Sequence, residues 1–204
     1  MRKQPEPLVE TVYEGEDLPH RLMWSIVQEQ AELARTRDRE WSNPSLVAMV
    51  FAFHAMEAYL NYVGLRLAPD IWQNEREHFR ASGFKGKLRE VMDRAGLNWE
   101  PGKRLLQTVL GLEKLRNAIA HGKPEKRAGK LTHSRDAAPP YPAFSLRTMF
   151  TPKAKMPKAV HDVEQLANEI QKAAKPKLKV NDVWFRSEAF YGPQSYSSRR
   201  TTLK

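Results

Sequence analysis

The chain has 204 residues, no cysteine and a formal net charge of +10 at neutral pH. A chain of this length can form one domain with a substantial core and still carry extensions. Without cysteine it has no disulfide and no thiolate metal ligand, which agrees with a reducing, cytoplasmic setting. The longest apolar run, Leu46 to Phe53, is too short to span a bilayer and the N-terminus lacks an apolar signal region, so we expect no membrane association.

The positive charge belongs to the second half of the chain. Residues 1–100 carry 13 Lys and Arg against 16 Asp and Glu, whereas residues 101–204 carry 21 against 8. Such an excess predicts a polyanionic partner. A basic tail that only keeps the protein soluble would give the same composition.

Two helices are expected in the first third of the chain, after a polar arm at residues 1–17. The first is predicted from about Leu18 to Glu40, where apolar side chains recur with helical spacing. Its apolar side is expected to carry Leu22, Ile26, Gln30 and Leu33. Asn43 as N-cap and Pro44 at the first helical position predict the start of a second helix that ends near Leu67.

The second helix is apolar nearly all round, as expected of the central helix of a bundle. Within it, His54, Glu57 and Asn61 recur at offsets of three and four and therefore share a face. Buried polar groups need partners, so these side chains can orient Arg116 on a later helix. They can equally form a structural network or a solvent-facing edge, and for His54 we favour a structural role.

Three further segments lead to the middle of the chain. A short helix is expected in the connection from about Ala68 to Gly83, and another helix from Phe84 to Ala95, closed by Gly96. A long helix is then predicted from Pro101 to His121. Its apolar stripe consists of Leu105, Leu106, Val109, Leu112, Leu115 and Ile119. Gly111 interrupts this stripe, which indicates close packing or a slight bend there.

Residues 122–157 break the helical pattern with basic and Pro-rich sequence, and 144–150 alternates enough to form a strand of a small hairpin. The basic side chains Lys123, Lys126, Arg127 and Lys130 can bind a nucleic-acid backbone, or they can belong to a solvated insertion. A last helix is predicted from Pro157 to Ala174. The bundle therefore spans residues 18–174, and 175–204 is a basic, aromatic tail.

The tail interleaves aromatic and basic side chains. Such side chains can stack on unpaired bases while binding phosphates. The alternative, which we favour for Trp184 and Phe185, is that they fix the tail to the bundle or to a second subunit. Disorder is expected after about Pro193.

Arg116, Asn117 and His121 form a group near the end of the long helix. An arginine binds phosphate oxygens with its planar fork, and a histidine transfers protons near neutral pH, so this group can act on a phosphodiester. Asn117 and His121 are four apart and share a helix face. The alternative is an ordinary C-terminal turn, in which Arg and His lie well against the negative end of the helix dipole.

The segment from Leu112 to Gly122, which reads LEKLRNAIAHG, resembles the signature helix of HEPN domains. In that family an Arg, four to six residues and a His form the motif, most often with Asn directly after the Arg. The segment from Phe53 to Asn61 is similar to the preceding core helix of many such proteins, and the likeness spans about residues 18–125. The resemblance implies an all-α bundle that cleaves RNA without a metal ion, leaves 2′,3′-cyclic phosphate ends and acts in toxin–antitoxin systems or antiviral defence.

The same resemblance implies catalytic roles for Arg116, Asn117 and His121, a symmetric homodimer and an antitoxin protein as a further partner. Lys123 stands where some relatives have a modified Tyr, so that regulation is not implied here. No sequence pattern for a metal site, a phosphate loop or a cofactor is present. The alternative function is a noncatalytic module that binds nucleic acid or mediates dimerisation.

Overall fold

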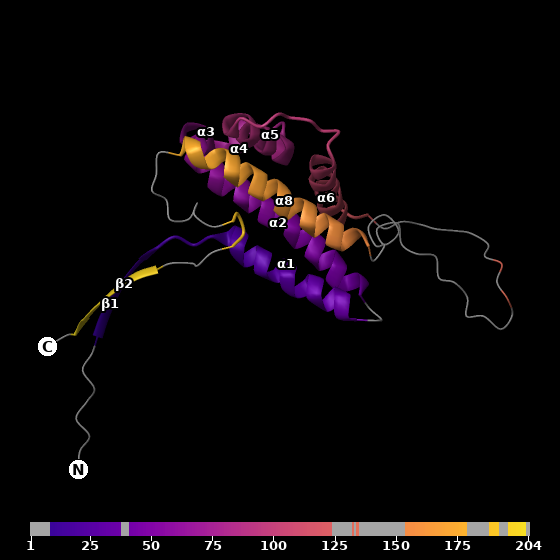
Figure 1. The fold of residues 1–204 in the computed structure, drawn as a ribbon, viewed down its shortest axis with the longest axis horizontal. Helices are drawn as coiled ribbons and strands as arrows, with labels where there is room; N and C mark the ends of the chain where they lie inside the picture. Colours follow the sequence, from indigo (N-terminus) through magenta and orange to yellow (C-terminus); the bar gives the residue numbers. More distant parts are fainter. Residues whose placement is uncertain are drawn as a thin grey trace, which may run out of the picture.

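The computed structural model describes residues 9–37, 41–123, 132, 134, 154–178, 188–191 and 196–202. Within these residues the chain forms a helical bundle, and a pair of strands extends away from it (Figure 1). The predicted all-α fold is thus confirmed for the bundle.

Helix α2 (Ser42–Leu67) is the centre of the bundle, and α1 (Pro19–Thr36), α5 (Gly83–Ala95), α6 (Arg104–Ala120) and α8 (Lys155–Ala174) pack around it (Figure 1). Its predicted burial is confirmed. The predicted Asn43 cap is wrong, because the helix already begins at Ser42 after Trp41. Pro44 is then the third helical residue and has no N–H for a cap to bind.

Helix α2 also passes a simple test for a membrane span. Among the described helices it alone has the length and hydropathy for one, and 56% of the tested window is buried inside the protein. The core helix of a soluble bundle passes the same test.

Helix α1 buries a different side from the predicted one. Trp24 and Val27 are fully buried against the bundle, whereas Leu22 is 60% exposed. The large ring of Trp24 removes more apolar surface from water than Leu22 could, and this decides which side faces inward. The helix also ends at Thr36, four residues before the predicted end.

Two short helices, α3 (Pro69–Gln73) and α4 (Glu75–His78), form the predicted connection to α5. The ammonium of Lys87 on α5 donates to Glu75 Oε1 at 2.6 Å and to Asn61 Oδ1 at 3.1 Å. These bonds link the connection to α2. As predicted, α5 closes at Gly96, whose φ of 81° lies in the left-handed region that favours glycine.

Helix α6 begins at Arg104, three residues later than predicted, and ends at Ala120 with His121 as its C-cap. Leu112 and Leu115 are buried, as expected. Ile119 is 40% exposed, so its predicted place in the core is wrong. Of the two alternatives predicted for Gly111, close packing is wrong, since a Cβ built there would meet no atom within 4 Å, and a slight bend stays a prediction.

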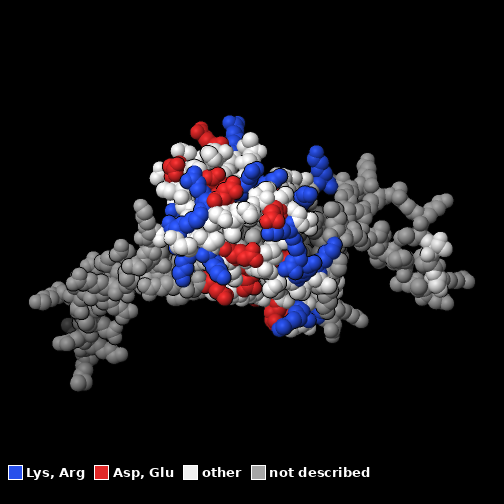
Figure 2. Space-filling model, turned by 45° about the horizontal axis from the view of Figure 1, so that its top comes forward, with Lys and Arg blue, Asp and Glu red and all other residues white. Residues whose placement is uncertain are grey.

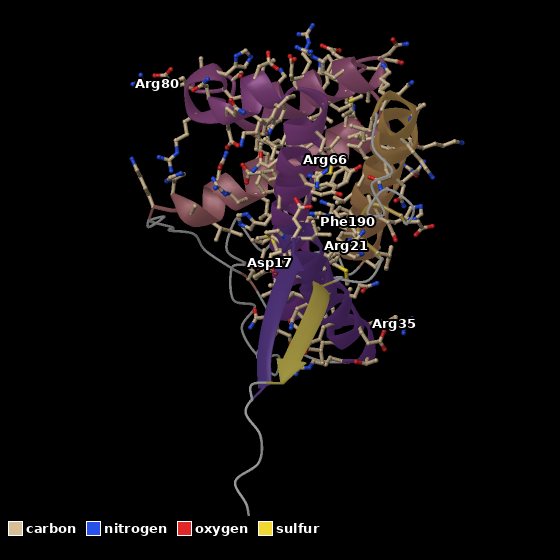
Figure 3. The ribbon with its side chains drawn as sticks, turned by 90° about the vertical axis from the view of Figure 1, so that its left-hand side faces the viewer. Asp17, Arg21, Arg35, Arg66, Arg80 and Phe190 are labelled. Atoms are coloured by element: carbon tan, nitrogen blue, oxygen red, sulfur yellow. The ribbon has the colours of Figure 1, made fainter. Side chains whose placement is uncertain are left out.

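Residues 188–191 dock onto α1 after the last helix α8 and the short 3-10 turn η1 (Lys175–Lys177). The ring of Phe190 stacks on Trp24 with 4.2 Å between centroids, and Phe190 lies beside the bundle in Figure 3. The hydroxyl of Tyr191 accepts bonds from Trp24 Nε1 at 3.2 Å and Gln28 Nε2 at 3.0 Å. Phe190 is thus unavailable for base stacking. Trp184 and Phe185, predicted to dock, lie outside the described residues.

The strands β1 (Val9–Gly15) and β2 (Tyr196–Thr202) pair antiparallel, with Val9 opposite Thr202 and Gly15 opposite Tyr196. β1 lies within the predicted polar arm at residues 1–17, whereas the disorder predicted after about Pro193 is wrong for Tyr196–Thr202. Val9, Thr11 and Val12 are β-branched and favour a strand, but the Glu residues around them give the segment a polar composition. The hairpin predicted around 144–150 lies outside the described residues, as does most of the insertion at 122–157.

Candidate functional site

Polar side chains gather where α2, α5 and α6 meet. His54 and Glu57 come from α2, Lys85 from α5, and Glu113 and Arg116 from α6. Electrostatic interactions connect these five groups, which we call the α2–α6 polar cluster. His54, Glu57, Glu113 and Arg116 lie at the half-buried margins of their helices, and Lys85 is exposed beside them.

Arg116 is held by its neighbour on the same helix. One of its terminal nitrogens donates to Asn117 Oδ1 at 2.9 Å. Its guanidinium carbon lies 6.0 Å from the ring centroid of Phe53, a buried residue of α2. An Asn directly after an Arg can therefore fix the direction of the guanidinium and leave other N–H groups for a phosphate.

Two members of the α2–α6 polar cluster, His54 and Glu113, have shifted pKa values. Burial lowers the pKa of His54, the positive charge of Arg116 lowers it further, and Glu57 opposes both effects. Burial and then the negative charge of Glu57 raise the pKa of Glu113, against the effects of Lys85, Arg116 and Lys114. Perturbed ionisable groups around a half-buried arginine are typical of functional sites.

His121 ends the motif helix as predicted. Its backbone N–H donates to the carbonyl of Asn117 at 3.0 Å, and its φ of −115° and ψ of 17° have left the helical range. The side chain is exposed. An imidazole in this position is accessible to a substrate or to a second protein chain.

Asn61 belongs to a different group of side chains from the one predicted. Its amide oxygen accepts from Lys87 Nζ at 3.1 Å and from Trp72 Nε1 at 3.4 Å. One helical turn beyond Glu57, Asn61 faces α5 and the connection before it rather than Arg116. Of the three side chains predicted to share a face, His54 and Glu57 belong to the α2–α6 polar cluster, and Asn61 belongs to the group around Lys87.

Comparisons with protein-family models, curated proteins and solved structures find no match to this chain.

Two members of the cluster, Lys85 and Glu113, were not predicted from the sequence. Glu113 precedes Arg116 by three residues, a spacing that puts both on one side of α6, so that this signal was available. Lys85 is brought in by tertiary packing, which no local spacing indicates.

One face of the described bundle carries charges of both signs. On the face drawn in Figure 2, Lys and Arg side chains are interspersed with Asp and Glu. Lys123 is exposed after α6, while the other predicted RNA-binding residues, Lys126, Arg127 and Lys130, lie outside the described residues. Within the described part of the chain, no group of three or more His, Cys, Asp or Glu could hold a metal ion.

Proposed function

We propose that this protein is a metal-independent endoribonuclease of the HEPN type. The observation that carries the proposal is the end of α6, where Asn117 holds the Arg116 guanidinium beside a polar cluster and His121 follows with an exposed imidazole. In this reaction the 2′-hydroxyl of RNA attacks the adjacent phosphorus and leaves a 2′,3′-cyclic phosphate.

The three motif residues have distinct roles in this proposal. Arg116 neutralises charge that develops on the phosphorane-like transition state, and Asn117 keeps its guanidinium in place. His121 transfers a proton. Lys123, Lys126, Arg127 and Lys130 bind the RNA backbone next to the site. No cofactor is involved.

A symmetric homodimer completes the site. The last turn of α6 exposes Ala118, Ile119 and Ala120, and an apolar turn next to a functional group favours contact with another protein surface. A second copy also brings a second His121 to the cleft, which suits a reaction that needs both an acid and a base. We place this enzyme in the cytoplasm, in a toxin or antiviral-defence role in which an antitoxin protein could be a further partner.

One observation favours a noncatalytic binding module as the second candidate. The carboxylate of Glu113 interacts electrostatically with Arg116 and competes with a phosphate for it. If that competition dominates, the motif serves helix termination and dimerisation, and the protein binds a partner without cleaving RNA.

The test is the rate of cleavage of an unstructured RNA in excess EDTA. The wild-type protein should cleave it, and His121→Ala should be slower by about 10²-fold or more, as is usual for the loss of a proton-transfer group. His161→Ala, which removes an exposed histidine of α8, is the matched control and should cleave at the wild-type rate. A requirement for Mg²⁺, or full activity of His121→Ala, would remove the proposal.

A further inference from the structure

His54 differs from the buried, satisfied histidine that the sequence favours. Its side chain is 34% exposed, so solvent and a substrate can reach the imidazole. Among the described residues its one polar contact is Nδ1 to Glu57 Oε2 at 4.0 Å, which is too long for a hydrogen bond. The imidazole thus has a nitrogen that none of the described residues occupies.

The charge of Arg116 acts on His54, and Arg116 is the residue expected to bind a phosphate. The rings of Phe53 and His54 are 5.7 Å apart, and the guanidinium of Arg116 lies 6.0 Å from the same Phe53 ring. Both side chains thus lie beside the Phe53 ring, and the charge of Arg116 acts on His54, so a phosphate bound to Arg116 comes into the surroundings of the imidazole. The negative charge of Glu57 on the Nδ1 side favours the tautomer with N–H there even without a direct hydrogen bond, which leaves Nε2 as the proton acceptor.

We propose that His54 is the general base of the ribonuclease, accepting at Nε2 the proton of the attacking 2′-hydroxyl. This inference rests on the proposed function and adds a catalytic residue to it. Glu57 is a positioning residue that sets the tautomer of His54. His121 is then the general acid, and the second His121 that a dimer brings to the cleft is not needed as the base.

The reaction balances within these groups. The 2′-oxygen loses its proton to His54 Nε2 and forms a bond to phosphorus, while the bond from phosphorus to the 5′-oxygen breaks. The 5′-oxygen takes a proton from the His121 imidazolium. His54 ends protonated and His121 neutral, and exchange with water restores both before the next turnover.

The charges around His54 favour the free base at neutral pH. Arg116 from α6 disfavours protonation and Glu57 on its own helix favours it, while Lys85 of α5 and Glu113 of α6 lie in the same cluster. Burial adds to the effect of Arg116, and together they lower the pKa of His54. Cleavage should therefore rise with pH on the acid side of about 6.5, the ordinary value for histidine.

The test compares His54→Gln with His121→Ala on two RNA substrates in EDTA. One is ordinary RNA, and in the other sulfur replaces the 5′-oxygen at a single cleavage site. A thiolate leaves without a proton because thiols are far more acidic than alcohols, so this substrate needs a base but no acid. On ordinary RNA both variants should lose about 10²-fold or more in rate.

On the sulfur substrate the two variants should diverge. His121→Ala should recover to within a few-fold of the wild-type rate, whereas His54→Gln should stay slow and lose the rise with pH. Circular dichroism checks that His54→Gln is folded, and His54→Ala serves as a second variant. Sulfur rescue of His54→Gln, or wild-type rates for both His54 variants, would overturn the inference and leave the ribonuclease intact. Absence of any cleavage by the wild-type protein would instead overturn the proposed function, and this inference with it.

Discussion

Arg116 hydrogen-bonds to a residue on its own helix, whereas the sequence left open whether Glu57 orients it. The bond to Asn117 Oδ1 is local and forms once α6 folds, so the guanidinium is oriented without a cross-helix ion pair. Glu57 acts at longer range, on His54 and Glu113. This separation leaves Arg116 with charge that a phosphate can neutralise.

The placement of Arg116, Asn117 and His121 at the end of one helix could be predicted, because the three residues are close in the chain and their spacing fixes their relation on a helix. Their catalytic roles stay a prediction. Prediction from the sequence failed for Asn61, whose partners Lys87 and Trp72 come from other elements. It also gave no indication of the buried, aromatic environment of His20.

His20 is buried among aromatic rings, with centroids 4.9 Å from Tyr62 and 5.7 Å from Tyr59, and Arg21 and Arg66 lie near it (Figure 3). Burial, and then the charges of Arg21 and Arg66, lower its pKa from 6.5 to about 3. Below pH 6.5 the unfolded chain therefore binds a proton that the folded protein does not. Stability contributed by a neutral His20 is present above pH 6.5 and is lost as pH falls toward 3.

We predict that the free energy of unfolding decreases more steeply with acid in the wild-type protein than in His20→Gln. Between pH 7 and pH 5 the difference between the two should amount to about 2 kcal/mol, the free energy of protonating a histidine of ordinary pKa in the unfolded state. Urea unfolding at both pH values measures it. Parallel loss of stability in the two proteins would show that His20 titrates normally when folded.

Among the elements, α6 combines a buried half with a projecting end. Val109, Leu112 and Leu115 hold it to the bundle, and Asp162 of α8 accepts from Thr108 at 2.7 Å. The carboxylate of Asp162 also lies 3.2 Å from Arg104, although its Oδ1 forms no hydrogen bond of good geometry within the described residues. We therefore regard the Thr108 bond as the firmer link. The last turn then extends beyond the core and presents the motif.

We predict that Gly111→Ala stabilises the protein. The position is helical and a Cβ there meets no atom within 4 Å, so the substitution should gain the difference in helix propensity, about 1 kcal/mol. For a protein of this size the melting temperature should rise by about 2–4 °C. Gly64→Ala is the matched control, since its Cβ would overlap the ring of Trp72 and should destabilise α2. A lower melting temperature for Gly111→Ala would mean that the site is packed after all.

The periodicity of apolar residues predicted most of the helices, but it predicted the wrong buried side for α1. The spacing of Leu22, Ile26 and Leu33 is helical, but tertiary packing selects the side with Trp24 and Val27. When a helix has two apolar sides, its own sequence does not tell which of them is buried, because that depends on the neighbouring elements.

At the scale of the whole molecule, the central place of α2 could be predicted from its apolar composition. The contacts between the two ends of the chain could not. Phe190 and Tyr191 return to Trp24 across more than 160 residues, and β1 pairs with β2 across a similar distance. Contacts of this kind leave no periodic signal in a sequence, because each partner is locally unremarkable.

We predict a homodimer in solution with a contact through the end of α6. Leu112 and Leu115 are already buried within one chain, so Ile119, at 40% exposure, is the apolar residue of the motif helix that a partner can cover. Light scattering at tens of micromolar should give twice the chain mass of 23.5 kDa for the wild-type protein. Ile119→Glu should give the monomer mass, because a charge in a dry contact is costly.

Leu22→Glu provides the control for that measurement, since Leu22 is exposed on α1, away from the motif. It should remain dimeric. A monomeric wild-type protein, or an equal effect of both substitutions, would contradict a dimer built on the motif helix.

The chemical structure of the RNA ends that the protein produces in excess EDTA tests the ribonuclease proposal most directly. Mass spectrometry of the products should find a 2′,3′-cyclic phosphate on one fragment and a 5′-hydroxyl on the other, because the 2′-oxygen is the nucleophile. The same RNA with a 2′-O-methyl group at the cleaved position should stay intact. Products with 3′-hydroxyl and 5′-phosphate ends, cleavage of the methylated RNA at that position, or no cleavage without a divalent metal would contradict the account.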